Sequence, residues 1–379
     1  MAERRLLFIL NTLNHSGAEV MLATAAPLWA NHGWTADILS AGQTPGDFAS
    51  HLEAAGYRLH HLRFARSPLF LWRLLRFFRR TRFDAVHIHT EQAGFWYALA
   101  AFLTGHRTIL RTVHATFSFT GSLRARRALQ RRIMRRVFGA AMTAPSRSVQ
   151  TNEAQTFGNP VRIVPNWIDT GRFRPPDAVE RQAARRAFDQ PADRFVIVSV
   201  GNCSPIKNHR AMIEALALLP PDLAWTWLHV GTGEDEATER KMAAQSGLDD
   251  RIRFLGRCDP RPALWAADCF VMPSMREGLG LAAAEALACG LRCVLADRPG
   301  LRDFAPYAEA ILWTAPEPAA IAAAVEAAAG SERTGTAGFA DVAQRVHKDF
   351  SPERGVSAFC ELYSAGRHDP ERLRNEAPQ

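Results

Sequence analysis

Short apolar runs alternate with longer amphipathic stretches from the start of the chain. The runs have the length of buried strands, and the stretches between them carry apolar residues at helical spacing. Strands that alternate with helices predict βαβ units and a parallel sheet. The predicted strands are residues 6–10, 35–39, 57–62, 85–88, 108–112 and 141–144. The predicted helices are residues 18–30, 70–80, 95–102 and 123–138.

The alternation stops near residue 165 and starts again near residue 195. Several prolines in this interval remove backbone donors and interrupt helices. We therefore predict an N-terminal domain over 1–165, a linker over 166–192 and a C-terminal domain over 193–350. The second set of predicted strands is 195–200, 227–230, 252–255, 269–272 and 292–295, and a last helix at 351–365 is expected to pack back on the N-terminal domain.

Length and composition are those of an ordinary globular protein. The chain has 379 residues, more than one hydrophobic core usually supports, so two α/β domains are expected. Two open parallel sheets would leave a cleft that faces the carboxyl ends of both strand sets. The first apolar run is too short for a signal sequence, and no run of about eighteen apolar residues occurs. Six cysteines without C-x-x-C spacing fit reduced thiols, so we expect a cytoplasmic protein.

A glycine-rich loop follows the predicted strand 269–272. Glu277-Gly278-Leu279-Gly280 leads into a helix that begins at Leu281. Such a junction offers free backbone N–H groups and the positive end of a helix dipole, which suit a diphosphate or sugar hydroxyls. Carboxylates at Glu277 and at Glu285, one turn inside the helix, can accept hydrogen bonds from hydroxyls. The alternative is that Glu277 caps the helix and Glu285 is solvated.

Two further loops carry candidate phosphate contacts. Gly201 ends the strand 195–200, and Lys207 follows six residues later, where close backbone approach and an ammonium group suit a phosphate. The loop lacks the G-K-[ST] ending of a Walker A motif, and an ordinary surface lysine is the alternative. Gly17, after the first strand, would let a ligand approach a helix N-terminus.

Histidines end two predicted strands of the N-terminal domain. His114 lies at the carboxyl edge after strand 108–112, where it can bond a hydroxyl or transfer a proton. His87 and His89 share one face of a strand, but a metal site there needs a third ligand that the sequence does not supply.

These segments together resemble the family-4 retaining glycosyltransferases of the GT-B fold. The strongest match runs from Ala267 to Gly290 and is similar to the family's A-D-x-x-x-x-P-S, E-G and E-A-x-A-x-G block. The resemblance covers nearly the whole chain, with supporting matches at residues 16–19, 114, 165–169, 173, 207–208, 230–233 and 254–256. It implies two Rossmann-like domains facing across a cleft, and transfer of a sugar from a nucleotide-diphosphate sugar to a hydroxyl.

The resemblance also implies roles for individual residues. Lys207 would neutralise the donor diphosphate, and Glu277 with the amides of 278–281 would hold the donor sugar and phosphate. Glu285 would bind the ribose hydroxyls. The other implied contacts are Gly17 and Asn202 at the phosphates, His114 at the transferred sugar and Arg257 near the base.

Two features of the sequence qualify this resemblance. Asn202 stands where the family often has an arginine, so one positive charge is missing and Lys207 is expected to carry more of the leaving-group stabilisation. The segment 166–169 also replaces the commoner N-G-V-D. No D-x-D motif occurs, so we expect neither a metal nor another cofactor, with UDP as the preferred nucleotide on family frequency. Retention is implied by the family, with the departing phosphate helping to deprotonate the acceptor.

The formal net charge of +8 is concentrated in two predicted helices. Residues 123–138 contain seven arginines and no acid, and residues 69–80 combine four arginines with aromatic side chains. Basic amphipathic helices suit an anionic membrane, so we expect docking through Arg131, Arg132, Arg135 and Arg136 at the inner face of the cell membrane. The alternative is a solvated arginine face over a core stripe formed by residues 129, 133 and 137.

Three functions follow from these observations. The first is a transferase that acts on a lipid-linked or polysaccharide-precursor acceptor. The second is a soluble transferase for a small natural product such as an aminocyclitol. The third is a non-catalytic nucleotide-sugar binder. Nucleic acid is not expected as a partner, because stacking aromatics are missing beside the arginines of 122–138.

Overall fold

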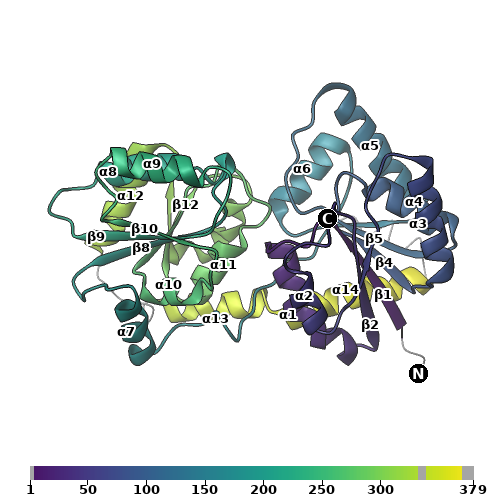
Figure 1. Cartoon of the computed structure of the whole chain (residues 1–379), viewed down its shortest axis with the longest axis horizontal. Helices are drawn as coiled ribbons and strands as arrows, with labels where there is room; N and C mark the ends of the chain where they lie inside the picture. The colour runs from purple at the N-terminus through teal and green to yellow at the C-terminus, as the bar shows by residue number, and fades with distance from the viewer. Residues whose placement is uncertain (1–3, 332–338, 369–379) are drawn as a thin grey trace. The chain divides into compact units, whose positions relative to one another are not determined.

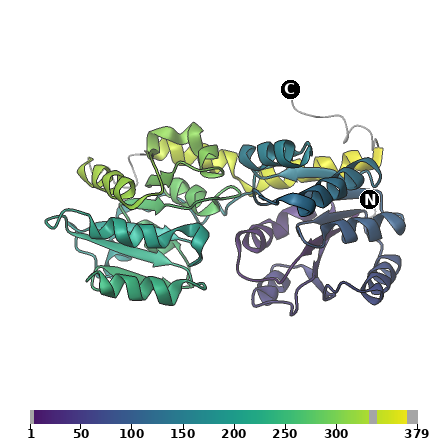
Figure 2. The same cartoon turned by 90° about the horizontal axis from the view of Figure 1, so that it is seen from above.

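The computed structural model describes residues 4–331 and 339–368, which fold into two compact α/β units (Figure 1). Unit 1 comprises Met1–Trp167 together with the C-terminal segment that begins at Pro352. Unit 2 comprises Ile168–Ser351. Each unit is built on one parallel sheet with helices on both of its faces, as the view from above shows (Figure 2).

Unit 1 contains a seven-stranded sheet in the order β3-β2-β1-β4-β5-β6-β7. Its strands are β1 (Arg4–Leu10), β2 (Trp34–Ser40), β3 (Arg58–His61), β4 (Ala85–Ile88), β5 (Thr108–Thr112), β6 (Ala141–Ala144) and β7 (Arg162–Ile163). Its helices are α1 (Gly17–Asn31), α2 (Ala49–Ala54), α3 (Pro68–Arg80), α4 (Gly94–Leu103), α5 (Gly121–Arg136), α6 (Arg147–Phe157) and α14 (Pro352–His368).

The alternation of side chains along β1 divides the core of unit 1 into two layers. Leu6 and Phe8 point into a cluster with α1 and α14, whereas Leu7 and Ile9 point into a cluster with α3 and α4. A parallel strand covered on both faces needs a continuous apolar run, which is the pattern seen in the sequence.

Helix α14 belongs to unit 1 although it is distant in sequence, and it packs on α1 and β5 (Figure 2). Gly355 on this helix lies against Trp167, where any Cβ would overlap the indole ring. The Trp167 indole N–H donates to the carbonyl of Met21 at 2.8 Å. Tyr363 lies 2.7 Å from His87 Nδ1, so the helix also reaches the centre of the sheet.

Unit 2 contains a six-stranded sheet in the order β10-β9-β8-β11-β12-β13. Its strands are β8 (Phe195–Val200), β9 (Trp225–Val230), β10 (Ile252–Gly256), β11 (Cys269–Met272), β12 (Arg292–Ala296) and β13 (Ile311–Thr314). The α-helices are α7 (Ala178–Ala187), α8 (His209–Ala217), α9 (Glu236–Gln245), α10 (Arg261–Ala266), α11 (Leu281–Ala288), α12 (Pro318–Gly330) and α13 (Ala340–Asp349). Two 3-10 segments, η1 (Pro205–Lys207) and η2 (Leu301–Ala310), complete the unit.

The segment 166–192, predicted as a linker, contains a helix that is part of unit 2. Asp177 caps α7 in a reciprocal capping box with Glu180, which starts the helix directly after the two prolines. Arg181 and Arg185 on α7 donate to the carboxylate of Asp268 at 2.6 and 3.2 Å. The prolines therefore delimit this helix rather than exclude one.

Other differences from the sequence prediction concern short or weakly patterned elements. Strands β7 and β13 and helices α2, α6, α9, α10, α12 and α13 were not predicted. Among the described helices, none combines the length and the apolar character needed to cross a lipid bilayer.

Candidate donor and acceptor sites

The sheet orders define one switch point in each unit. Strand β8 lies next to β11 in unit 2, and β1 lies next to β4 in unit 1, so chain connections leave in opposite directions there. In open α/β sheets, ligands bind outside the carboxyl ends of the strands at such a point. The loops after β8 and β11 contain the predicted phosphate-loop and glycine-rich residues.

The structure brings Lys207 and Glu277 together at the switch point of unit 2. Lys207 Nζ lies 2.7 Å from Glu277 Oε1, and both side chains are mostly buried. Gly201 keeps room for this lysine, because a Cβ at residue 201 would lie 3.3 Å from Lys207 Cε. The two loops are also joined by a hydrogen bond from the Met275 N–H to the Ile206 carbonyl at 2.8 Å. A cation and a carboxylate are thus held at adjoining strand ends.

Two glycines give the β11–α11 loop its shape. Gly280 has φ of +82° and directly precedes α11, so the chain turns into the helix at a conformation that other residues adopt poorly. Gly300 has φ of +90°, and a Cβ there would overlap the carbonyl oxygen of Glu277. The Glu277 N–H donates to Pro299 at 3.3 Å. Gly278 and Leu279 complete the turn. Helix α11 begins at Leu281, so its first backbone amides follow Glu277 closely in the sequence.

Glu285 lies on the second turn of α11 in an enclosed setting. Part of its surface stays accessible, and the surrounding protein atoms raise the pKa of its carboxyl to about 8. The positive charge of Arg172 opposes this rise and the negative charge of Asp259 adds to it. Arg172 and Asp259 themselves form an ion pair at 3.2 Å. Glu285 is therefore mostly protonated at neutral pH without a ligand.

The structure leaves Asn202 and Arg257 at more open positions. Asn202 is exposed and accepts a hydrogen bond from the Ser204 hydroxyl at 3.4 Å. Its side-chain amide is uncharged and adds no cation to the loop. Arg257 is exposed and directly follows β10, two strands away from β8. The sequence prediction gave little weight to Gly231 in the β9–α9 loop. A Cβ there would overlap the Gly201 carbonyl oxygen, so this glycine lets the two loops touch.

At the switch point of unit 1, His114 pairs with a second histidine. Its Nε2 lies 2.7 Å from Nδ1 of His89, and burial lowers the pKa of His114 to about 4, so the ring is neutral at pH 7. His87 contacts Tyr363 and Thr112 with its two nitrogens at 2.7 Å each, which occupies both potential metal-ligating atoms. The partnership of His89 with His114 was missed, although both residues end adjacent strands.

Gly17 is the first residue of α1 and is exposed. Burial raises the pKa of the Glu19 carboxyl two residues later, and the hydroxyl of Ser16 donates to that carboxyl. The loop after β1 therefore presents a helix N-terminus at the position that was predicted for phosphate contact.

The structure corrects the expected role of Arg131 as a membrane contact. Its side chain is fully buried and donates to the Glu153 carboxylate through Nε at 2.7 Å and Nη2 at 2.9 Å. It also contacts Glu91, a residue of the β4–α4 loop. Arg131 points inward because its guanidinium pairs with the carboxylates of Glu153 and Glu91, which other elements bring to it. Arg135 is partly buried, whereas Arg132 and Arg136 are exposed.

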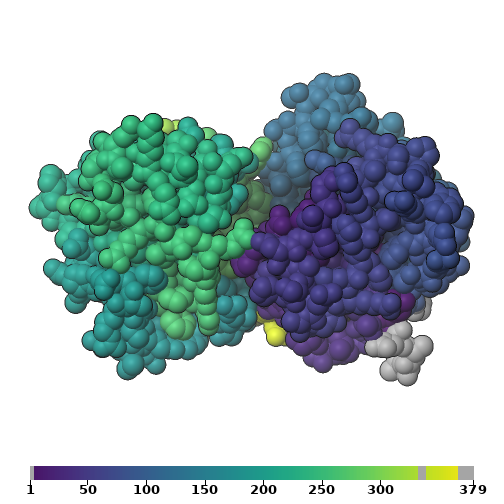
Figure 3. Space-filling model, viewed as in Figure 1, coloured from purple at the N-terminus to yellow at the C-terminus, as the bar shows by residue number. Residues whose placement is uncertain are grey.

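The alternative interpretation, a core stripe of residues 129, 133 and 137, holds only for Ile133, which packs against the core. Leu129 on α5 and Val137, the residue after this helix, are each 56% exposed. Among the described residues of unit 1, every exposed large apolar side chain lies on α3, α4 or α5 or directly after α5: Leu69, Trp72, Trp96, Leu103, Leu123, Leu129 and Val137. These three helices are neighbours and lie at the surface of unit 1 (Figure 3).

The two parallel-sheet α/β units match the fold of GT-B glycosyltransferases of known structure. The model for "Glycosyl transferases group 1" matches residues 180–334, and the model for "Glycosyltransferase Family 4" matches residues 15–172. The chain therefore belongs to glycosyltransferase family 4 and is a glycosyltransferase.

Three known proteins illustrate the relationship. EpsF of Bacillus subtilis (strain 168), which its name places among glycosyltransferases, is 29% identical over 310 residues, 78% of this chain and 80% of EpsF. An Escherichia coli UDP-Gal:alpha-D-GlcNAc-diphosphoundecaprenol alpha-1,3-galactosyltransferase is 28% identical over 62% of each chain. The crystal structure of Anabaena Alr3699/HepE with UDP and glucose superimposes with a TM-score of 0.81 at 19% identity, covering 96% of this chain and 100% of that chain. Alignments with seven relatives, the Escherichia coli enzyme among them, span 33–62% of their lengths.

Proposed function

We propose that the protein is a retaining, metal-independent hexosyl- or N-acetylhexosaminyltransferase that moves a sugar from a UDP-sugar to a lipid-linked acceptor. The assignment of the donor site rests on the ion pair between Lys207 and Glu277 at the β8–β11 switch point, beside the N-terminus of α11. UDP is preferred because Alr3699/HepE was crystallised with UDP and with UDP-glucose, and the Escherichia coli relative is named for UDP-Gal.

In this proposal the donor diphosphate binds Lys207, and the ion pair between Lys207 and Glu277 breaks. The bond between the anomeric carbon and the diphosphate oxygen breaks, and negative charge grows on the leaving UDP. A bond forms between the acceptor oxygen and the same face of the anomeric carbon, and the acceptor proton passes to the departing phosphate. Lys207 and the first amides of α11 stabilise the growing charge. Glu277, released from its ion pair, accepts hydrogen bonds from the sugar hydroxyls.

His114 contributes as a neutral hydrogen-bonding group to the transferred sugar. Its low pKa, caused by burial, keeps the ring uncharged over the physiological range. A neutral imidazole can donate to or accept from a sugar hydroxyl without adding a positive charge next to the forming oxocarbenium centre.

The surface of unit 1 supports a membrane-bound acceptor. The apolar side chains on α3, α4 and α5 stand among exposed arginines, including Arg73, Arg76, Arg132 and Arg136. Trp72 is 53% exposed, and indole rings favour the interface between water and lipid. Basic residues add about 1 kcal/mol each near an anionic surface. Such a surface suits an enzyme whose acceptor is anchored in the bilayer, as in the name of the Escherichia coli relative.

The test is transfer of labelled sugar from a UDP-sugar panel to polyprenyl-diphosphate-linked sugars in anionic vesicles. We expect incorporation into lipid, reduced at least tenfold when zwitterionic vesicles replace anionic ones. Charge reversal of Arg132 and Arg136 should have the same effect, whereas reversal of the exposed Arg58 and Arg63, outside these helices, should not. Transfer only to soluble acceptors such as cyclitols, independent of vesicles, would replace the acceptor assignment. Binding without any transfer would leave a nucleotide-sugar binder.

A further inference from the structure

Four side chains with metal-ligating atoms converge in the interior of unit 2. Cys203 lies in the β8–α8 loop, His209 is the first residue of α8, His229 lies on β9 and Glu239 lies on α9. One sulfur, nitrogen or oxygen atom from each lies within 4.8 Å of those from the other three. All four residues are buried, with His229 at 0% and Glu239 at 1% exposure. Buried polar groups are as a rule hydrogen-bonded, and buried charges are paired or coordinate metals.

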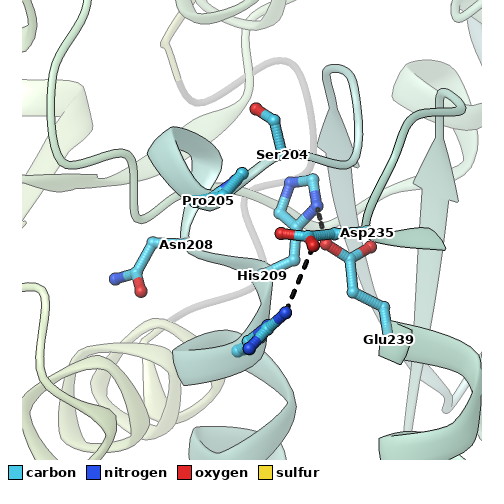
Figure 4. Close-up of a pocket in the computed structure, with 7 residues that line it drawn as sticks. Ser204, Pro205, Asn208, His209, Asp235 and Glu239 are labelled. Carbon is cyan, nitrogen blue, oxygen red and sulfur yellow. Dashed lines mark hydrogen bonds and ion pairs between the residues drawn. The ribbon is translucent and has the colours of Figure 1, made fainter. Parts of the chain in front are cut away.

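Most polar atoms of this cluster lack a hydrogen bond among the described residues. Both ring nitrogens of His229 have no hydrogen-bond partner there, and the Glu239 carboxylate is approached only by Cys203 and His209, members of the same cluster. His209 Nδ1 lies 3.3 Å from Glu239 Oε1, an ion-pair contact without hydrogen-bond geometry (Figure 4). Each buried polar group left unsatisfied costs about 1–3 kcal/mol, and a charged one costs more. The cluster therefore contains buried ligand atoms whose bonding capacity the described side chains leave unused.

We propose that Cys203, His209, His229 and Glu239 bind one Zn²⁺ ion. Thiolate, imidazole and carboxylate are the three ligand types that zinc takes in proteins, usually four at a time in a tetrahedron. With bonds near 2.0–2.3 Å, tetrahedral ligand atoms lie about 3.4 Å apart, so the cluster needs only a modest contraction. Binding displaces the thiol proton, which leaves to solvent. One thiolate, one carboxylate and two neutral imidazoles then balance the two positive charges of the ion.

A bound cation suits the chemistry of these four side chains. A divalent ion would pair with the Glu239 carboxylate and, once the thiol proton has left, with the Cys203 thiolate.

A pocket beside the cluster offers a route for the ion. Ser204, Pro205, Asn208 and Asp235 line it together with His209 and Glu239 (Figure 4). Asp235 pairs with Arg210, which also lines the pocket, at 3.2 Å. Two of the four ligands, His209 and Glu239, thus border an open pocket, which gives an ion access to the cluster after folding.

The ion would act as a structural clamp on the β8–α8 loop. The Cys203 N–H already donates to Thr232 at 3.2 Å, and its carbonyl accepts from Asp235 at 3.1 Å, so this loop is bound to the β9–α9 loop. Lys207 follows four residues after Cys203. If the proposed donor role of Lys207 holds, the ion fixes the start of the loop that presents it. This is distinct from metal-assisted catalysis, and the expectation of metal-independent transfer is unchanged.

The test is the zinc content of the full chain, purified without a histidine tag and dialysed against metal-free buffer. We expect about one zinc per chain by elemental analysis, falling below about 0.1 in Cys203→Ser and in His229→Gln. Cys258→Ser, which removes an exposed thiol of the same unit, is the matched control and should keep its zinc.

A second measurement keeps the proposal testable if those variants fold poorly. Cobalt(II) loaded into the wild-type chain should give a thiolate-to-cobalt absorption band and the visible spectrum of a tetrahedral site. A chelator should lower the Tm by about 5 °C or more, with recovery on adding Zn²⁺ but not Mg²⁺. Wild-type chain that holds no zinc and takes up none when it is supplied would overturn the proposal. So would zinc that persists in folded Cys203→Ser and His229→Gln. Because zinc content is read without turnover, a failure of the donor assignment would not affect this result.

Discussion

Replacement of Glu285 by glutamine should change how nucleotide binding depends on pH. The pKa of this carboxyl is raised to about 8, chiefly by burial, so at neutral pH the unliganded site holds a proton. Ribose hydroxyls donate their hydrogen bonds best to the ionised carboxylate. Binding of UDP must then release that proton below pH 8, and this release weakens the apparent affinity.

The size of the effect follows from the pKa. The fraction of ionised Glu285 falls about tenfold for each pH unit below 8, so the apparent Kd for UDP should rise about 10-fold from above pH 9 to pH 7. Above pH 8 the affinity should level off. Glu285→Gln should bind UDP more weakly at pH 9 than the wild type and should lack the slope between pH 6.5 and 9.

The same residue gives a stability effect with a defined sign. Folding raises the pKa of the Glu285 carboxyl from 4.5 to about 8. Below pH 4.5 this carboxyl is protonated in both the folded and the unfolded chain, so it does not lower the free energy of unfolding. As pH rises from 4.5 to 8, the unfolded chain loses the proton first, and the free energy of unfolding falls by up to ~5 kcal/mol. Glu285→Gln should remove this fall and be the more stable protein at pH 8.

Calorimetric titration of UDP at five pH values, in buffers of differing ionisation enthalpy, measures both affinity and proton release. Urea unfolding across the same range checks the stability effect. Phosphate titration of UDP itself occurs near pH 6 and is shared by the variant, so the wild type minus variant difference isolates Glu285. Affinity that is flat or that falls from pH 6.5 to 8 in the wild type would refute the role of the ionised carboxylate at the ribose.

Three further substitutions test other parts of the structure. Lys207→Met should lower kcat by about 10²–10³-fold in a steady-state transfer assay, because it removes the cation that stabilises the leaving diphosphate; an unchanged kcat would exclude that role. Gly231→Ala should destabilise the protein by about 1–3 kcal/mol in urea unfolding, since a Cβ there overlaps a neighbouring carbonyl, whereas Gly330→Ala, with no atom within 4 Å, should be neutral or stabilising. Arg131→Met should cost about 3–5 kcal/mol because it leaves a buried carboxylate unpaired, while Arg132→Gln should stay within about 0.5 kcal/mol; equal effects would mean that burial of the first was misjudged.

The strands in the middle of each sheet could be predicted closely from the sequence. Residues 85–88, 108–112, 141–144 and 269–272 match β4, β5, β6 and β11 residue for residue. Parallel strands covered on both faces need continuous apolar runs, and these stand out against amphipathic helices. Strand β7 has only two residues, both partly exposed, and carries no such signal.

Features that depend on distant partners could not be predicted. Arg131 is buried because Glu153 and Glu91 come to it from α6 and from the loop after β4, separations of 22 and 40 residues. Helical spacing alone placed it on an exposed face. The cluster of Cys203, His209, His229 and Glu239 has no recognisable spacing either, since its members meet only through the pairing of β8 with β9 and the packing of α8 on α9.

The candidate donor residues were located by motif, and their arrangement depends on topology. Lys207 and Glu277 lie in the segments that follow neighbouring strands, because the sheet order places β8 beside β11, with β9 and β10 on the other side. The 2.7 Å ion pair between them is a tertiary contact that no local pattern encodes. Their roles in transfer stay predictions that the experiments above address.

The most direct test of the donor assignment is thermal unfolding of the wild type and Glu285→Ala with UDP, GDP and ADP at equal concentrations. A ligand that binds only the folded state raises the Tm according to its concentration relative to Kd. We predict that UDP raises the Tm of the wild type, that GDP and ADP have much smaller effects, and that Glu285→Ala loses most of the shift. No shift with any nucleotide, or an equal shift in the variant, would contradict the assignment of the donor site to α11 and the β8–β11 switch point.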